Sequence, residues 1–344
     1  MLNDLSPWLA TPTGQAPPPP LPSLPPLPEF ENILAAQRGL RGLLLETPTV
    51  RHPRLDALLG AETWVKLENT QPLGAFKVRG GLHMLAQAPP HVRRRGFVSA
   101  TRGNHGQSLA YACARYGSRC TLFIPRGNDA AKNRAMRSLG AELIVAGDTF
   151  DEAWAAAEAY AQAEGPELVH PGRTMELVEG VATLALELLD QVDGPLDAVF
   201  VPVGVGSCII GTARVVKTLS PGTQVIGVQA AHAPAMTLAW RGEDPSPEPM
   251  RETLACGLAV GHAAPDSIAA MATLVDDMVL VEEDDIARAI RWYATTLHQL
   301  AEGAGAAALA GAYTLRKRFE GRRIAVILSG GNIELGRLRS VLTP

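Results

Sequence analysis

Short apolar runs alternate with longer amphipathic segments along most of the chain. The apolar runs have the length and composition of buried strands, and they cover residues 97–100, 121–125, 142–145, 198–203, 225–228 and 324–328. The amphipathic segments predict helices, and they cover residues 32–41, 107–116, 130–139, 151–164, 175–191 and 209–219. Asp151 is a candidate helix cap, and Gly117 and Gly140 stand where helix-ending glycines belong. Alternating strands and helices predict an α/β fold with parallel sheets and right-handed crossovers.

The positions of these segments indicate two lobes, each built on its own parallel sheet. We expect residues 86–177 to form the smaller lobe, and residues 30–85 together with 178–344 to form the larger one. Residues 1–29 are different, because they are rich in proline, which fixes φ and removes hydrogen-bond donors. They are expected to form a polyproline-like or disordered arm. A docking site for proline-reading domains is an alternative, and a flexible tail is the simpler interpretation.

The composition excludes several classes of function. The 344 residues carry a formal net charge of −4, so no basic field for nucleic acid is expected. No apolar run reaches the roughly 20 residues of a membrane helix, and no secretory signal is visible. The four cysteines form no C-x-x-C pair and the histidines form no zinc-binding pattern. We therefore expect a cytoplasmic protein with reduced thiols and no metal site.

The segment 66–81 places one lysine, Lys77, behind the aromatic Phe76 and after a glycine-containing turn. A lysine beside packed apolar groups is partly desolvated, and desolvation favours its neutral, nucleophilic form. Such an amine can form a Schiff base with an aldehyde cofactor. Taken alone, however, the residue is better explained as a solvated lysine at the start of a helix.

Three further motifs follow predicted strands. Segment 101–107 opens a helix with two glycines, so its N–H groups suit a carboxylate, and a strand–helix turn with a capping Asn is the alternative. In segment 203–211, successive N–H groups can surround a phosphate. A dinucleotide-binding turn is disfavoured there, because the third glycine comes too late and Gln229 stands where an acid would hold a ribose. Ser329 ends the last strong strand, at a sheet edge where α/β folds bind ligands or where an ordinary turn occurs.

The order of these features resembles the fold type II pyridoxal-phosphate enzymes, specifically the threonine/serine dehydratase and serine racemase group. The resemblance covers about residues 35–340. Its motifs are the stretch through Phe76-Lys77, Gly103-Asn104-His105-Gly106, the loop 204–208, Glu302-Gly303-Ala304-Gly305-Ala306 and Ser329-Gly330-Gly331-Asn332. The resemblance implies a tryptophan synthase β-like fold with the active site between two parallel-sheet lobes, and pyridoxal 5'-phosphate as the cofactor.

The resemblance also implies roles for individual residues. Lys77 would form the Schiff base and abstract the α-proton. Glu302 would stand near the cofactor ring as an acid, or would cap a helix. The other cofactor-binding residues would be Phe76 on the ring, Asn104 at the phenolic oxygen, Gly204, Val205, Gly206, Ser207 and Cys208 at the phosphate, and Ser329 at the pyridine nitrogen. The substrate carboxylate site would be lined by Thr101, Arg102, Gly103, Asn104 and His105.

The implied reaction is the dehydration and deamination of L-threonine, L-serine or both, giving 2-oxobutanoate or pyruvate with ammonia. A serine hydroxyl at the ring nitrogen, rather than a carboxylate, favours prompt loss of the β-substituent over racemisation. Threo-3-hydroxyaspartate or phenylserine dehydratase, serine racemase and a β-replacement synthase are alternatives with related chemistry. A non-catalytic ligand-binding α/β protein is the alternative of another class, and it would not need Lys77. Family members suggest a homodimer or homotetramer.

Some positions depart from the family pattern around the expected site. Ala75 stands where many members have serine, and Val205 and Ser207 replace glycines of the usual phosphate loop. Arg102 stands where racemases carry the serine that reprotonates the α-carbon. Arginine is a poor acid at neutral pH, so elimination is favoured. Arg102 can also reach an anionic side chain, which keeps hydroxyaspartate open as a substrate, or it is a solvated loop residue.

Two more departures concern regulation. Gln229 and Ala235 stand at or near the positions of carboxylates that bind a divalent cation in some members, so no activating Mg²⁺ or Ca²⁺ is expected. The chain ends soon after Asn332, so we expect no C-terminal regulatory domain. A catabolic role fits these expectations better than a biosynthetic one.

Overall fold

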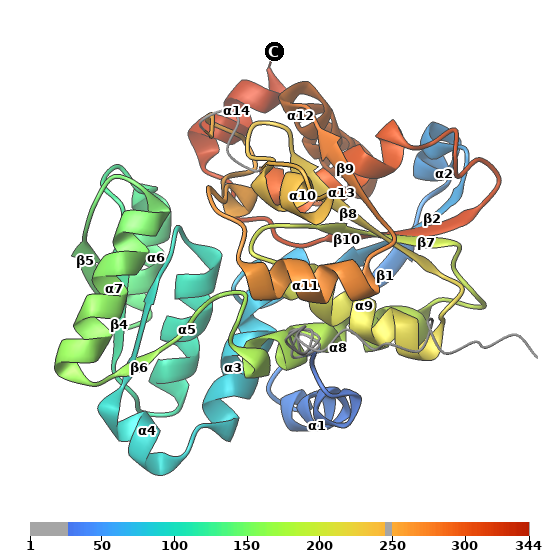
Figure 1. Ribbon diagram of the computed structural model, residues 1–344. Helices are drawn as coiled ribbons and strands as arrows, with labels where there is room; N and C mark the ends of the chain where they lie inside the picture. The colour runs from blue at the N-terminus through green and yellow to red at the C-terminus, as the bar shows by residue number, and fades with distance from the viewer. Residues whose placement is uncertain (1–26, 245–249, 344) are drawn as a thin grey trace, which may run out of the picture.

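The computed structural model describes residues 27–244 and 250–343, so the predicted N-terminal arm lies almost entirely outside the described residues. Two separate sheets, one of six strands and one of four, organise the chain (Figure 1). The mixed α/β class and the parallel sheets confirm the prediction from the hydrophobic pattern. The residue boundaries of the two lobes stay a prediction.

The larger sheet has the strand order β1-β2-β10-β7-β8-β9. Its edge strand β1 pairs antiparallel to β2, and the other neighbouring strands pair in parallel. The strands are β1 (Thr49–Arg51), β2 (Glu62–Leu67), β7 (Ala198–Pro202), β8 (Gln224–Ala230), β9 (Asp277–Val281) and β10 (Arg323–Leu328). β7 and almost all of β10 are buried, because helices cover both faces, and buried strands of this kind are continuous apolar runs.

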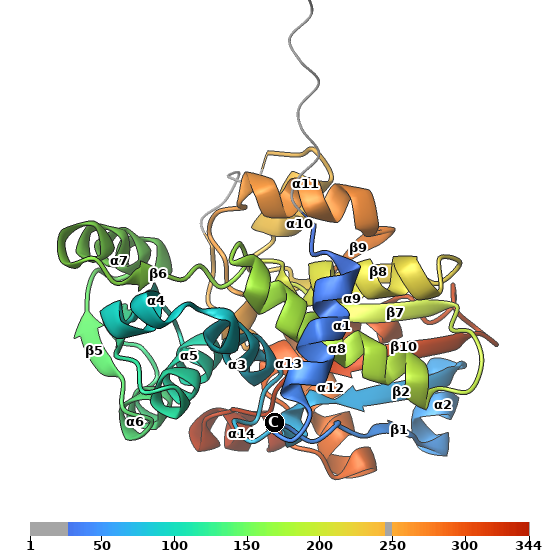
Figure 2. The same cartoon turned by 90° about the horizontal axis from the view of Figure 1, so that it is seen from below.

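Helices cover both faces of the larger sheet. On one face, α13 (Gly303–Thr314) packs on the central strands, with α12 (Glu283–Trp292) against it. On the other face, α9 (Ser207–Leu219) packs on β7 and β8, and α8 (Met175–Gln191) lies beside α9 (Figure 1). Figure 2 shows α1 (Phe30–Leu40) crossing the outside of α8. The shorter segments are α2 (Pro53–Leu59), α10 (Ala235–Trp240), α11 (Pro265–Leu274), α14 (Leu335–Leu342), the 3₁₀ turns Glu68–Thr70 and Cys256–Leu258, and the π-helical turn Tyr293–Leu297.

The smaller sheet has four parallel strands in the order β5-β4-β3-β6. These strands are β3 (Phe97–Ala100), β4 (Cys120–Ile124), β5 (Glu142–Val145) and β6 (Glu167–Leu168). Side chains of α5 (Asn104–Arg115) and α6 (Ala130–Ser138) pack on one face, and α7 (Phe150–Glu164) packs on the other. The short α4 (Pro90–Arg95) precedes β3.

Helix α3 (Lys77–Gln87) connects the two parts of the molecule, because it packs against α5 on one side and α8 on the other. Both contacts are close. A Cβ atom at Gly80 would lie 2.7 Å from the carbonyl oxygen of Leu177, and one at Gly81 would lie 2.8 Å from that of Ser108. Glycine at these two positions therefore lets the helix that begins at Lys77 sit tightly between its neighbours.

The predicted elements are present, with small shifts at their ends. Each strand expected from an apolar run occurs at that run, and helices α5 and α9 begin a few residues earlier than expected, directly after the glycine loops. Gly117 and Gly140 follow α5 and α6 with φ values of 66° and 89°, as predicted. The predicted cap of α7 is wrong, because Thr149 rather than Asp151 caps this helix and forms a capping box with Glu152.

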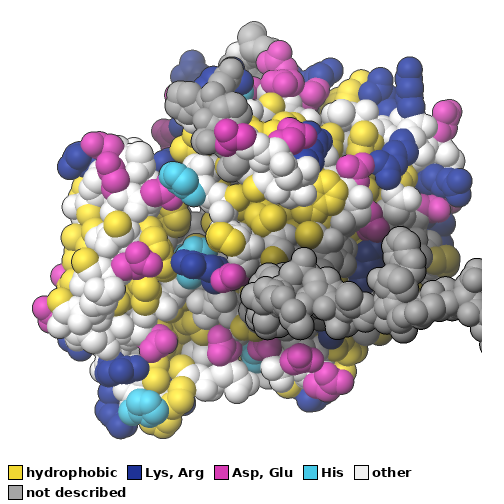
Figure 3. Space-filling view, in the orientation of Figure 1, with side chains coloured by type: hydrophobic (Ala, Val, Ile, Leu, Met, Phe, Trp, Pro, Cys, Tyr) yellow, Lys and Arg dark blue, Asp and Glu magenta, His cyan; other side chains and the backbone are white. Residues whose placement is uncertain are grey.

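The surface carries charges of both signs. On the face seen in Figure 3, basic and acidic side chains are interspersed rather than gathered into one field. None of the helices in residues 27–244 and 250–343 has the combination of length and hydropathy that a membrane span requires.

Candidate active site

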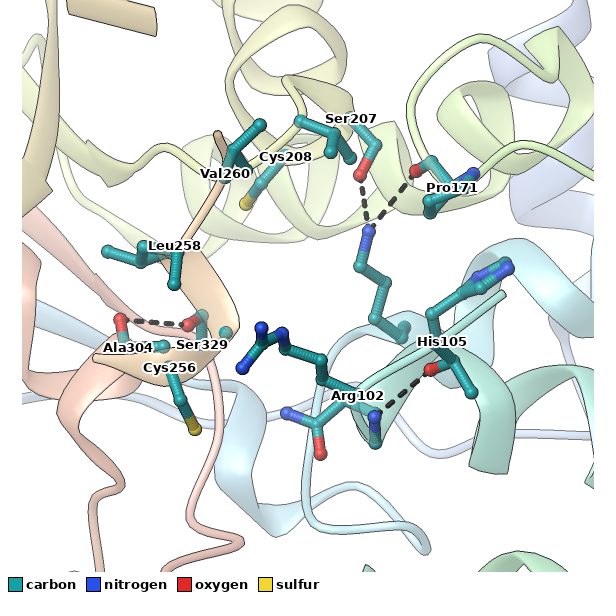
Figure 4. Close-up of a pocket in the computed structure, with 18 of the residues that line it drawn as sticks. Arg102, His105, Pro171, Ser207, Cys208, Cys256, Leu258, Val260, Ala304 and Ser329 are labelled. Atoms are coloured by element: carbon teal, nitrogen blue, oxygen red, sulfur yellow. Dashed lines mark hydrogen bonds between the residues drawn. The ribbon is translucent and has the colours of Figure 1, made fainter. Parts of the chain in front are cut away.

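A cavity lies where the carboxyl ends of β3, β7 and β10 face the segment that joins β2 to α3 (Figure 4). Every residue predicted for the site lines this cavity: Phe76, Lys77, Thr101, Arg102, Gly103, Asn104, His105, Gly204, Val205, Gly206, Ser207, Cys208, Glu302 and Ser329. The cavity is also lined by residues that the sequence did not indicate, namely Lys132, Phe150, Pro171 and the segment 256–260. The structure therefore brings the separate motifs together in one place.

Lys77 is the first residue of α3, and its amine is held within the cavity. The Nζ atom donates to Ser207 Oγ at 2.7 Å and to the carbonyl oxygen of Pro171 at 3.3 Å (Figure 4). It also lies 5.1 Å from the centre of the Phe76 ring. Burial lowers the pKa of Lys77 to about 8, and within the described residues no carboxylate pairs with it. A solvated surface lysine, the simpler interpretation of the sequence, does not agree with this buried and hydrogen-bonded amine.

The loop 204–208 joins β7 to α9 and forms one wall of the cavity. Its backbone is close to the facing segment, since a Cβ atom at Gly204 would lie 2.9 Å from the carbonyl oxygen of Gly257. Gly206 has φ of 106°, whereas Val205 and Ser207, which replace glycines, do not adopt positive φ. The glycine that adopts a left-handed backbone is therefore retained, and the first N–H groups of α9 have no intrahelical acceptor.

The loop between β3 and α5 forms the opposite wall. Thr101 Oγ1 accepts hydrogen bonds from the backbone N–H groups of Gly103 and Gly106, both at 3.0 Å. These bonds fix the turn and leave the N–H groups of Asn104 and His105 at the first turn of α5, where no intrahelical carbonyl can accept them. A helix N-terminus of this kind suits an anion such as a carboxylate.

Glu302 is part of a polar network rather than a helix cap. It precedes α13, but its side chain forms no capping bond. Its carboxylate accepts from Asn104 Nδ2 and from Lys132 Nζ, the latter at 3.0 Å. Asn332 Nδ2 in turn donates to Asn104 Oδ1 at 2.9 Å. Burial lowers the pKa of Lys132, but the charge of Glu302 outweighs burial and raises it above its usual value.

Two imidazoles lie beside the Lys77 amine in neutral form. Burial, the charge of Lys77 and the neighbouring His170 hold the pKa of His105 well below its usual value. Burial, Arg173 and Lys77 lower the pKa of His170 to about 3. Ser99 Oγ donates to the carbonyl oxygen of Val169 at 2.6 Å and lies 2.9 Å from His105 Nε2, so the hydrogen is assigned to Nε2.

The remaining predicted residues differ in their surroundings. Ser329 follows β10 at the carboxyl edge of the sheet, as predicted, and donates to the carbonyl oxygen of Ala304 at 3.4 Å. Burial raises the pKa of Cys208 to about 12, so this thiol is neutral. The Arg102 side chain extends into the cavity (Figure 4), and its Nε atom is buried without a hydrogen-bond partner.

Gln229, one of the positions considered for a divalent cation, forms hydrogen bonds within the fold. Gln229 Oε1 accepts from the backbone N–H and the hydroxyl of Thr237, both at 2.9 Å, and so anchors α10. Within residues 27–244 and 250–343, no group of three or more His, Cys, Asp or Glu side chains is arranged to hold a metal ion.

Comparisons with known proteins identify the family of this chain. Residues 40–330 match the family described as "Pyridoxal-phosphate dependent enzyme". The chain is 34% identical over 313 residues to the L-threonine ammonia-lyase of Thermotoga maritima, covering 91% of this chain and 78% of that protein.

Solved structures of enzymes with related names have a similar fold. The processed form of threonine deaminase isoform 2 from Solanum lycopersicum superposes with a TM-score of 0.82 at 28% identity, covering 92% of this chain and 95% of that one. Maize serine racemase superposes with a TM-score of 0.84 at 26% identity, covering 91% and 96%. The chain belongs to the pyridoxal-phosphate dependent enzyme family, with the fold type II architecture that its sequence predicted.

Proposed function

We propose that this protein is an ammonia-lyase that converts L-threonine and L-serine to 2-oxobutanoate and pyruvate, with release of ammonia. The observation that carries the proposal is the Lys77 amine, which burial makes a weaker base and which faces the cavity without a carboxylate partner among the described residues. The relatives named threonine ammonia-lyase and threonine deaminase support the same reaction type.

The residues around the cavity fit pyridoxal phosphate. Loop 204–208 offers backbone N–H groups at the N-terminus of α9 for the phosphate, and a Cβ at Gly204 would narrow this cradle against Gly257. Phe76 would contact the ring, Asn104 the phenolic oxygen and Ser329 the ring nitrogen. Lys77 would attach to the aldehyde. When bound, the cofactor supplies an electron sink that makes the substrate α-proton acidic.

The protein groups would then bind the substrate and move one proton. The N–H groups of Asn104 and His105 would hold the α-carboxylate at the first turn of α5. Lys77 Nζ, once released as a neutral amine, would take the α-proton, and its pKa of about 8 keeps a larger fraction of it neutral near neutral pH than for an ordinary lysine. Both imidazoles stay neutral near it, so neither supplies a competing acid at that pH.

Assay of 2-oxo acid release from a panel of β-hydroxy amino acids tests this proposal. Holoenzyme should form 2-oxobutanoate from L-threonine and pyruvate from L-serine, with equal rates before and after chelator. Borohydride should bleach a yellow protein and leave a cofactor adduct on Lys77. A colourless protein that binds amino acids without releasing 2-oxo acids would instead be a non-catalytic member of the fold.

Serine racemase is the second candidate, because maize serine racemase has a closely similar structure. Racemisation needs a proton donor on the face of the α-carbon opposite the lysine. Arg102 stands where that donor would come from, and a guanidinium is a poor acid. We therefore expect pyruvate to form faster than D-serine, and the opposite ratio would favour the racemase.

We also propose a cytoplasmic homodimer or homotetramer. Cys113, Cys120, Cys208 and Cys256 are free thiols, which fits a reducing compartment. Light scattering on the purified protein measures the number of subunits, and a monomer at all concentrations would contradict the proposal.

A further inference from the structure

Arg102 differs from the other charged groups of the cavity because no described residue pairs with it. Lys132 and Glu302 form an ion pair at 3.0 Å, and Lys77 donates to a hydroxyl and a carbonyl. Arg102 forms no ion pair within the part of the chain that the structure describes, and its Nε is buried and unbonded. A buried donor without an acceptor is costly, so this group is expected to meet an acceptor when the cavity is filled.

The two anions already assigned to the cavity have other donors. The cofactor phosphate would use the backbone N–H groups of loop 204–208, and the substrate α-carboxylate would use the first turn of α5. Glu302 is the one carboxylate among the described lining residues, and Lys132 already neutralises it. The positive charge of Arg102 is therefore needed neither for the cofactor phosphate nor for the substrate α-carboxylate.

We propose that the cavity prefers a β-hydroxy amino acid whose side chain carries a second carboxylate, and that Arg102 binds this carboxylate. This inference rests on the proposed ammonia-lyase function. The smallest substrate of this class is 3-hydroxyaspartate, whose carboxylate matches the two-pronged geometry of a guanidinium. The methyl group of threonine offers no acceptor, so Arg102 Nε stays unsatisfied when threonine is bound.

The reaction balances without an oxidant or another reactant. The Cα–H and Cβ–O bonds break, and the proton and the hydroxyl leave as water. The resulting enamine becomes an imine, and hydrolysis of that imine consumes one water and releases ammonia. The net change converts 3-hydroxyaspartate to oxaloacetate and ammonia.

The test compares 3-hydroxyaspartate with L-threonine on the holoenzyme and on Arg102→Leu and Arg102→Lys. Oxaloacetate and 2-oxobutanoate are measured with coupled dehydrogenases. We expect kcat/KM to favour 3-hydroxyaspartate in the unaltered protein. Arg102→Leu should lower that value by about 100-fold, as loss of a charge-assisted bond does, and should lower the value for threonine by a much smaller factor. Arg102→Lys should give an intermediate loss, since it keeps the charge without the fork.

Arg126→Leu is the matched control. Arg126 also lies in a loop after a strand of the smaller sheet, but it is exposed and pairs with Asp148. It should leave both kcat/KM values unchanged, which separates a local contact from a general effect of charge. Equal losses on both substrates in Arg102→Leu would assign Arg102 to the α-carboxylate and overturn the inference.

Binding of L-aspartate gives a readout that needs no turnover. Calorimetry should show that the holoenzyme binds L-aspartate more tightly than L-2-aminobutyrate, and that Arg102→Leu removes the difference. If no substrate is converted, the proposed ammonia-lyase function fails, and the aspartate measurement still decides whether Arg102 binds a second carboxylate. Equal affinity of the two ligands in the unaltered protein would contradict the inference.

Discussion

Two cations on helix α3, Lys77 and Arg79, lie two residues apart in opposite surroundings. Arg79 is buried and bound on all sides: Nε and Nη2 donate to Glu68, Nη1 and Nη2 donate to Glu187, and Nη1 also reaches Thr183. Lys66 adds a second cation, 2.8 Å from Glu187. We call Lys66, Glu68, Arg79 and Glu187 the buried ion cluster, which contains two charges of each sign.

The hydrogen-bond acceptors of Lys77 are one hydroxyl and one carbonyl, whereas Arg79 donates to two carboxylates. The pKa values reflect this difference. Burial lowers the pKa of Arg79, but its two carboxylates outweigh burial and raise it above the usual range. Burial lowers the pKa of Lys77 to about 8, and no carboxylate compensates. Paired charges on this helix therefore serve the structure, and an unpaired one is free for chemistry.

Replacement of Lys77 should give the largest change in activity. Lys77→Ala is expected to lower kcat by at least about 10⁴-fold, because it removes both the attachment point and the general base. The purified variant should also lack the yellow colour of the attached cofactor. Lys317→Ala, which removes an exposed lysine, is the control and should keep full activity. Retention of more than a hundredth of the activity in Lys77→Ala would refute the role of this amine.

Replacement of Arg79 should give the largest change in stability. Arg79→Met leaves two buried carboxylates with one cation, and breaking a buried pair in this way costs about 3–5 kcal/mol. Lys77→Met is the matched control on the same helix. It removes a desolvated amine without a carboxylate partner, so the free energy of unfolding should stay the same or rise. Urea denaturation of both variants measures the contrast, and equal losses would show that the two cations are equivalent.

The walls of the cavity could be predicted because their signals are local. Parallel strands that are covered on both faces are continuous apolar runs, and the loops that follow them meet at one edge of the sheet. The glycines after residues 97–100 and 198–203 therefore marked the two turns that we assign to anions, and Ser329 was placed by the same rule. The cap of α7 was missed because Thr149 and Asp151 are both good capping residues, and the choice depends on where the chain turns.

The ion pairs could not be predicted, because their partners lie far apart in the sequence. Lys132 and Glu302 are separated by 170 residues, and Arg79 and Glu187 by 108. Lys132 lies in the polar helix α6, and nothing in the sequence of this helix indicates that one of its residues lines the cavity. Lys66 also makes β2 difficult to predict. This charged residue interrupts the apolar pattern of the strand, although its side chain is fully buried. The hydrophobic pattern therefore does not predict ion pairs between residues that are distant in the sequence.

The pH dependence of cofactor uptake measures the lowered pKa of Lys77. In the proposed reaction the neutral amine of Lys77 would attack the aldehyde, and the pKa of this amine is lowered from 10.5 to about 8. The rate of pyridoxal phosphate uptake by the cofactor-free protein should therefore rise with pH, reach half its maximum near pH 8 and then become constant. Stopped-flow absorbance measures this rate. A rate that still rises steeply above pH 10 would indicate an ordinary solvated lysine.

The smallest effect is expected at the edge of the buried ion cluster, where Thr47 Oγ1 donates to Glu68 at 2.6 Å. Thr47→Val keeps the shape but removes this donor, so the free energy of unfolding should fall by about 1–2 kcal/mol. Activity should change by less than about twofold, because Glu68 does not line the cavity. Thr218→Val, which alters an exposed threonine on α9, is the control and should cost less than about 0.5 kcal/mol. A loss of activity in Thr47→Val without a loss of stability would mean that the cluster positions Lys77 as well as holding the fold, and the separation between paired and unpaired charge on α3 would no longer stand.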